Sequence, residues 1–138
     1  MSPIVYIEKG AKMHDAMARA GLHLVCINNV FMTSSDPVAV QAFIAAYDAL
    51  PDVKSDLIAL FKADGLVRIQ AIYPAITDTD HLDMWSDLWG AIKAGGRNPA
   101  ANLEKAIAIR AAMVTAIAAV NAALTIPQVK LVTVTWPP

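Results

Sequence analysis

Apolar residues recur every three or four positions along residues 98–124, and this pattern predicts one long helix. Asn98 is a good N-cap, and Pro99 suits the first helical position, where its missing N–H leaves no helical hydrogen bond unmade. No charged residue occurs between Arg110 and Lys130, and alanine fills much of the remaining surface. We therefore expect wide coverage of this helix, either inside a bundle or along the seam of a homo-oligomer. Its apolar positions are Leu103, Ile107, Met113, Val114, Ile117, Val120 and Leu124.

The beginning of the chain shows strand-like alternation and turn signals instead. Asn28 and Asn29 tolerate positive φ, so they predict the tight turn of a β-hairpin. Gly21 is a natural C-terminal stop for the helix before it. The predicted elements are a strand at 3–8, a helix at 13–20, and strands at 23–27 and 30–33.

A strong helix start follows the hairpin. Ser35 or Asp36 can cap it, and Pro37 can occupy its first position. This helix is predicted over 38–49, and residues 50–52 break and restart the chain.

The next helix is predicted over 53–73, where Pro74 ends it. Gly65 lies inside it and costs about 1 kcal/mol relative to alanine. That glycine indicates a kink, a division into two helices, or a close crossing with another helix. The apolar positions are Leu57, Ile58, Leu60, Phe61, Val67, Ile69 and Ile72.

Two further elements complete the pattern. A helix over 81–93 would place Trp85 and Trp89 one turn apart on its apolar face. Residues 129–136 alternate β-branched residues and predict a terminal strand, with Trp136 as an anchor. We expect this strand to pair with the N-terminal sheet or with the sheet edge of a partner.

These elements predict an α+β fold. Residues 1–50 form a small β-α-β-β module, and residues 51–138 form a helical bundle with the long alanine-rich helix and a C-terminal strand. The two parts can also form one integrated domain. The candidate interface residues are Trp85, Trp89, Met113, Ile117, Val120, Leu124 and Trp136.

Composition favours contacts with other proteins over contacts with nucleic acid or membrane. Charged residues make up 17% of the chain, and the net charge is −1. No basic field exists to attract nucleic acid or anionic lipid. The longest uncharged stretch, 111–129, is interrupted by polar residues, so no membrane span is expected. The single Cys26 excludes an intramolecular disulfide, and the N-terminal residues lack a signal-peptide pattern, so we expect synthesis in the cytoplasm.

No residue pattern for catalysis, cofactor binding or metal binding is found. The three histidines lack metal-ligand spacing, and His14 is expected on the solvated side of its helix. An acidic cluster spans residues 78–87, but its spacing does not fit a calcium loop, and helix capping explains it better. Gly95 and Gly96 precede a helix, which is typical of a tight loop more than of an anion site.

Several short motifs resemble a known group of proteins. Residues 6–10 (YIEKG), 13–21 (MHDAMARAG) and 34–41 (SSDPVAVQ) resemble the opening of small proteins encoded near the tail-fibre genes of tailed bacteriophages. Residues 50–74 are similar to a helix of such proteins and of tail-fibre-assembly proteins, which ends in Arg-Ile and Tyr-Pro and precedes a tryptophan-bearing helix. The resemblance implies a virion component or assembly factor without enzymatic activity.

Two functions follow as expectations. The first is a structural or adaptor protein of the phage tail that binds fibre, tip or baseplate and is located in the virion. The second is a tail-fibre assembly chaperone that is absent from the finished particle. Low charge and the alanine-rich helix favour the first, because a permanent interface is more apolar than a transient one.

Overall fold

The computed structural model describes residues 1–74, 76, 94–96 and 101–138. Its contacts divide the chain into two compact units, Met1–Asp52 and Val53–Pro138. The first unit contains a small antiparallel sheet with two helices, and the described elements of the second are helical. This arrangement confirms the α+β class.

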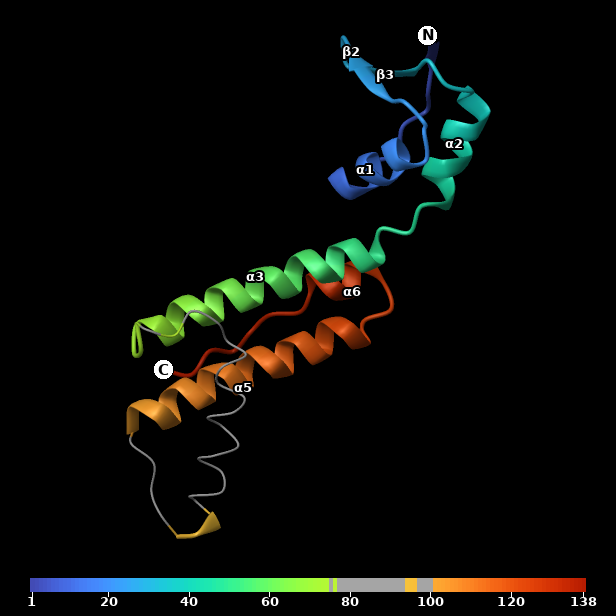
Figure 1. Ribbon diagram of the computed structural model, residues 1–138. Coiled ribbons are helices and arrows are strands. Elements are labelled where there is room, and N and C mark those ends of the chain that lie inside the picture. The colour runs from blue at the N-terminus through green and yellow to red at the C-terminus, as the bar shows by residue number, and fades with distance from the viewer. Residues whose placement is uncertain (75, 77–93, 97–100) are drawn as a thin grey trace. The chain divides into compact units, whose positions relative to one another are not determined.

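Three short strands form the sheet of the N-terminal unit (Figure 1). They are β1 (Ser2–Pro3), β2 (Val25–Ile27) and β3 (Val30–Thr33), in the order β1-β3-β2. Asn28 and Asn29 have φ values of 51° and 63°, as a two-residue hairpin turn requires. The predicted hairpin is therefore confirmed.

The strand predicted over 3–8 is wrong for most of its length. The backbone N–H of Ile4 donates to the carbonyl of Phe31 at 2.8 Å, and no described backbone bond joins the next residues to the sheet. Instead the carboxylate of Glu8 accepts a hydrogen bond from the N–H of Gly10 at 2.9 Å. A side chain that binds nearby backbone in this way competes with ladder formation.

Helices α1 (Ala11–Arg19) and α2 (Pro37–Ala46) pack with the sheet around one core. The side chain of Asp36 accepts the N–H of Val38 at 3.1 Å, and Pro37 lies in the first turn, so the predicted helix start is confirmed. The core consists of Ile4, Met13, Met17, Val40 and Ile44.

The end of α2 is held by a lysine from a distant part of the sequence. The ammonium of Lys9 donates to the carbonyls of Ile44 at 2.6 Å, Ala45 at 3.2 Å and Tyr47 at 2.8 Å. A cation placed at a helix C-terminus satisfies carbonyls that have no helical partner and complements the helix dipole. The helix therefore ends at Ala46 instead of residue 49.

The break predicted at residues 50–52 lies earlier, at residues 47–49, and α3 (Leu50–Gln70) begins directly after it. The carboxylate of Asp48 accepts the N–H of Leu50 at 3.0 Å and so satisfies one free donor of the new helix. Proline at position 51 fits the first turn, where the prediction had placed a break.

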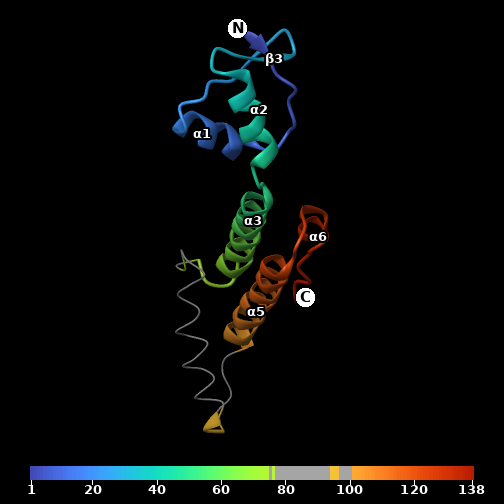
Figure 2. The same cartoon turned by 90° about the vertical axis from the view of Figure 1, so that its right-hand side faces the viewer.

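In the C-terminal unit, α3 and α5 (Ala101–Ala122) lie side by side and run antiparallel (Figures 1 and 2). The ammonium of Lys54 on α3 donates to the carbonyl of Asn121 in the last turn of α5 at 2.9 Å. Helix α3 continues through Gly65 without a break. A Cβ atom there would lie 3.1 Å from Sδ of Met113, so the close helix crossing is the correct alternative.

The buried face of α5 differs from the predicted apolar face. It passes through alanines, whereas Val114 is exposed and Leu124 is 79% exposed. An alanine side chain is small, so another segment can approach the helix closely there. Which residues of this helix are buried therefore depends on the size of the side chain as well as on its apolarity. The buried residues are Leu103, Ala106, Ile109, Met113, Ala116 and Val120.

The strand predicted over 129–136 is wrong. Residues Ile126–Lys130 form the short helix α6, and residues 132–138 belong to no strand. The hydroxyl of Thr125 accepts the N–H of Gln128 at 3.3 Å, and the side chain of Gln128 accepts the N–H of Leu124 at 2.8 Å. Thr125 is thus the N-cap of α6, and Gln128 reaches back to the residue before the cap, so these bonds fix a helix start where the alternation had predicted a strand.

Within the part of the chain that the structure describes, no helix is both long and apolar enough to cross a membrane. The helix predicted over 81–93 lies outside the described residues, as do the caps predicted at Asn98 and Pro99.

Candidate functional site: an apolar groove on the C-terminal unit

The C-terminal segment, defined here as residues 132–136, returns along α3 after α6 (Figure 1). Its residues alternate in exposure, because Val132, Val134 and Trp136 are half-buried while their neighbours are exposed. The alternation seen in the sequence is thus real, although it reflects an extended segment lying on helices and not a paired strand.

Trp136 fixes the end of this segment. Its ring lies against the core pair Ile69 and Ile109, and a Cβ on Gly65 would be 3.4 Å from the ring. The guanidinium carbon of Arg68 stands 4.7 Å from the ring centroid, within the range of a cation–π interaction. An indole held from two sides keeps the segment on α3, although no described residue pairs with its backbone as a strand.

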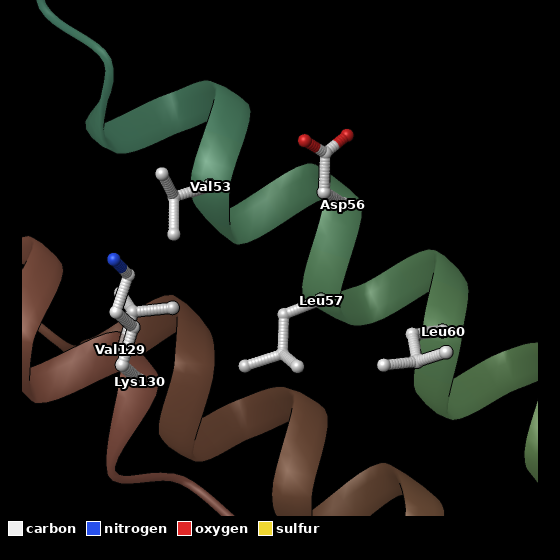
Figure 3. Close-up of a pocket in the computed structure, with 6 residues that line it drawn as sticks. All are labelled: Val53, Asp56, Leu57, Leu60, Val129 and Lys130. Carbon is white, nitrogen blue, oxygen red and sulfur yellow. The ribbon is translucent and has the colours of Figure 1, made fainter. Parts of the chain in front are cut away.

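A first hollow of about 350 Å³ lies between the beginning of α3 and α6 (Figure 3). The side chains of Val53, Leu57 and Leu60 point towards it, while the carboxylate of Asp56 points away (Figure 3). Val129 and Lys130 form its other side.

A second hollow of about 530 Å³ continues along α3 from the first. Leu60 lines both hollows, so they adjoin along the helix, and the two together are called the groove below. Asp64 lies in the second hollow and pairs with Arg68 at 3.3 Å, one helical turn away. The lining of the second hollow is Leu60, Phe61, Ala63, Asp64, Val67, Val132, Thr133, Val134 and Trp136.

Large apolar side chains stand open to solvent along this groove. Leu60 is 63% exposed, Val67 65%, and Leu131, between the two linings, 80%. The charged residues of the groove lie among aliphatic ones, and the Asp64–Arg68 pair is itself half-exposed. Such a surface offers apolar area for binding, and it does not bring acid, base and nucleophile together at one point.

The predicted interface residues have different places in the structure. Met113 and Val120 are buried on α5, Ile117 is half-buried, and Leu124 is exposed. Among those that the structure describes, Trp136 is the one that lines the groove. Trp85 and Trp89 lie outside the described residues. Self-association through α5 stays a prediction.

Sequence reasoning missed the groove residues of α3. Leu57, Leu60 and Val67 had been placed on one apolar side with Phe61 and Ile69. In the structure Phe61 and Ile69 are buried, whereas Leu60 and Val67 are exposed. The sequence does indicate an open flank on this helix, because its apolar residues are too widely spread to face a single neighbour, but it does not indicate which of them are exposed.

A polar cluster in the N-terminal unit was also missed. His14 was expected to be solvated, which is wrong, because it is half-buried and its Nε2 lies 2.7 Å from the hydroxyl of Tyr6. The same hydroxyl donates to Glu8 at 3.0 Å, so Nε2 of His14 donates to the hydroxyl oxygen in turn. The Tyr6 ring also stacks on Phe31, with centroids 3.6 Å apart.

Two pKa values in this cluster are perturbed. The N–H of Gly10, and after it the hydroxyl of Tyr6, hold the pKa of Glu8 below its ordinary value. Burial, and after it the hydrogen bond to Glu8, raises the pKa of Tyr6. The hydrogen bonds that lower the pKa of Glu8 also shape residues 6–10. Among the described residues, no group of three or more His, Cys, Asp or Glu could hold a metal ion.

Comparison of the chain with protein-family models, curated proteins and solved structures gave no match.

Proposed function

We propose that the chain is a non-enzymatic structural or adaptor protein of a phage tail, which binds a fibre, tip or baseplate protein through the groove of its C-terminal unit. The groove is the observation that carries the binding role. Exposed leucines and valines beside a hollow are favourable contact area, since their transfer out of water contributes roughly 25 cal/mol per Å². The phage setting rests on the resemblance of residues 6–41 and 50–74.

The groove suits a segment of a partner protein better than a small substrate. It is long, runs parallel to α3, and is lined mainly by aliphatic side chains. Lys130 and Asp64 lie among those side chains and could orient a partner by charge. An apolar groove along a helix is a common way of holding a helix or an extended peptide.

A tail-fibre assembly chaperone is the alternative. Such a protein would use the same groove on a folding fibre and would then leave it. The half-open character of the groove is compatible with release, whereas the low charge of the chain favours a permanent contact.

Mass spectrometry of purified virions separates the two proposals. A structural role predicts a fixed copy number of the chain per particle, and a chaperone role predicts its presence in infected cells but its absence from particles. Absence from particles, together with failure to bind the fibre, tip and baseplate proteins encoded near its gene, would contradict both.

A further inference from the structure

The edge of the N-terminal sheet is the most informative surface outside the groove. The strand order leaves β2 at one edge of the sheet. Cys26 pairs with Phe31 across the hairpin, and Ile27 pairs with Val30 beside the turn. In a two-residue hairpin the pair beside the turn exchanges hydrogen bonds, so the next pair does not.

Cys26 therefore directs its backbone N–H and C=O away from β3, towards the free edge. Phe31, which lies opposite Cys26 on β3, supports this assignment. Its carbonyl points away from β2 and accepts the N–H of Ile4 at 2.8 Å. No group of the described chain forms a hydrogen bond with the backbone of Cys26. The edge thus presents one donor and one acceptor in strand geometry.

This edge lacks two of the usual protections against pairing, which are charged side chains and proline. Residues 20–35 contain no Asp, Glu, Lys, Arg or Pro. Val25 and Ile27 are β-branched and are 40% and 44% exposed. Exposed edge strands without charge or proline are templates for another strand.

We propose that β2 pairs antiparallel with β2 of a second copy of this chain, about a two-fold axis at Cys26, to give a continuous six-stranded sheet. Each Cys26 then exchanges two backbone hydrogen bonds with the Cys26 of the second copy. Val25 of each copy lies opposite Ile27 of the other, which is a favourable cross-strand combination.

The occupant is a second copy because the edge is complementary to itself. A two-fold interface uses the same surface of both subunits. Here Cys26, whose backbone groups face outward, lies at the centre, and the residues on both sides of it, Val25 and Ile27, are β-branched and uncharged. The pairing also extends a sheet whose other edge strand, β1, has only two residues. Since β2 is three residues long, the dimer is weak and depends on concentration.

The native cysteine reports this pairing directly. Hydrogen-bonded residues opposite each other in antiparallel strands have Cα atoms about 5.5 Å apart, so a short bis-maleimide linker can join the two thiols without strain. Bis-maleimidoethane treatment of the full chain, followed on denaturing gels, should link it through Cys26 at least about tenfold faster than a Cys26→Ser, Val38→Cys variant. In that variant the thiol lies on α2, at a residue that is 73% exposed. Equal rates would overturn the proposal.

Charge placement tests the register. Val25→Lys with Ile27→Lys brings like charges together across the axis, and should lower the dimer fraction in sedimentation and the rate of cross-linking through Cys26 at least about tenfold. Val25→Lys with Ile27→Glu places opposite charges together and should restore both, while circular dichroism shows that both variants stay folded. If the two double variants behave alike, or if the wild type sediments as a monomer at high concentration, the paired edge is wrong. A strand of another protein would then be the remaining occupant.

Discussion

The two units of this chain bury their apolar residues in different ways. In the N-terminal unit, side chains from the sheet and both helices meet in one cluster, where Met13, Met17 and Ile44 are almost completely covered. In the C-terminal unit, two long helices lie side by side and a short extended segment covers part of the surface between them. Helix α3 keeps Leu60 and Val67 exposed beside a groove.

The difference shows how architecture decides which apolar residues are available for binding. A sheet covered by two helices can enclose methionine and isoleucine from several directions. A helix in a pair contacts its neighbour along one stripe only, so a helix with apolar residues around more of its surface retains open flanks. The groove is the flank that the C-terminal segment leaves uncovered.

Truncation of one apolar residue in each unit, buried in the first and exposed in the second, should give the largest contrast. Ile44→Ala removes a fully covered side chain of the N-terminal core and should lower the free energy of unfolding of that unit by about 3 kcal/mol. Leu60→Ala removes a side chain that is already 63% exposed and should change stability by no more than about 0.5 kcal/mol. Urea denaturation, followed by hydrogen exchange to locate the affected unit, measures both. Similar losses would mean that the groove is covered in solution.

A larger side chain at Gly65, where the helices cross, should have the next largest effect on stability. Gly65→Val should destabilise the C-terminal unit by about 2 kcal/mol, because its methyl groups would meet Met113 and the ring of Trp136. Gly65→Ala is the matched control. Its better helix propensity, about 1 kcal/mol, offsets a contact of 3.1 Å with the flexible side chain of Met113, so thermal unfolding should change little. A valine variant as stable as the wild type would contradict the close crossing.

Substitution of a lysine at a helix end in each unit should have a smaller effect on stability. Lys9 binds three carbonyls at the C-terminal end of α2, whereas Lys54 binds one exposed carbonyl in α5. Lys9→Ala should cost about 1.5 kcal/mol, and Lys54→Ala no more than about 0.5 kcal/mol. Denaturant midpoints at matched ionic strength decide this. Equal shifts of the two midpoints would contradict a larger stabilisation by Lys9 than by Lys54.

The smallest expected effect depends on pH. The pKa of Glu8 is lowered in the folded chain by the N–H of Gly10 and the hydroxyl of Tyr6. Its carboxylate therefore contributes stability above the unfolded pKa, and this contribution is lost as the pH falls through the folded pKa. Glu8→Gln should reduce the loss of thermal stability between about pH 6 and about pH 3. If Glu8→Gln loses as much thermal stability at low pH as the wild type does, the hydrogen bonds of the Glu8 carboxylate do not stabilise the folded chain.

Local signals were sufficient for much of the N-terminal unit. The Asn28–Asn29 turn and the Asp36–Pro37 helix start act over a few residues, so the sequence alone predicts them. The hydrogen bonds of Thr125 and Gln128 at the start of α6 are equally local, although the alternation after them is typical of a strand. Here a short-range hydrogen-bond pattern decided the structure against the longer hydrophobic pattern.

The groove could not be predicted in the same way. Whether Leu60 or Phe61 is buried depends on the rotation of α3 against its neighbours, and the hydrophobicity of these residues is similar. Likewise, Ala106 and Ala116 are buried on α5 while Val114 is exposed, because the close approach of another segment selects small residues. Which residues of α3 and α5 are buried is therefore decided by how the helices pack, and not by the hydrophobicity of each residue.

Binding of a tail protein to groove variants tests the central claim most directly. By titration calorimetry with the fibre, tip or baseplate protein encoded near its gene, Leu60→Asp should weaken binding at least about 30-fold, since it places a carboxylate in the apolar contact. Ala59→Asp introduces the same charge at the adjacent exposed residue outside the groove lining, and should bind within about threefold of the wild type. Equal binding by Leu60→Asp and the wild type, or equal weakening by both variants, would contradict the groove as the binding surface.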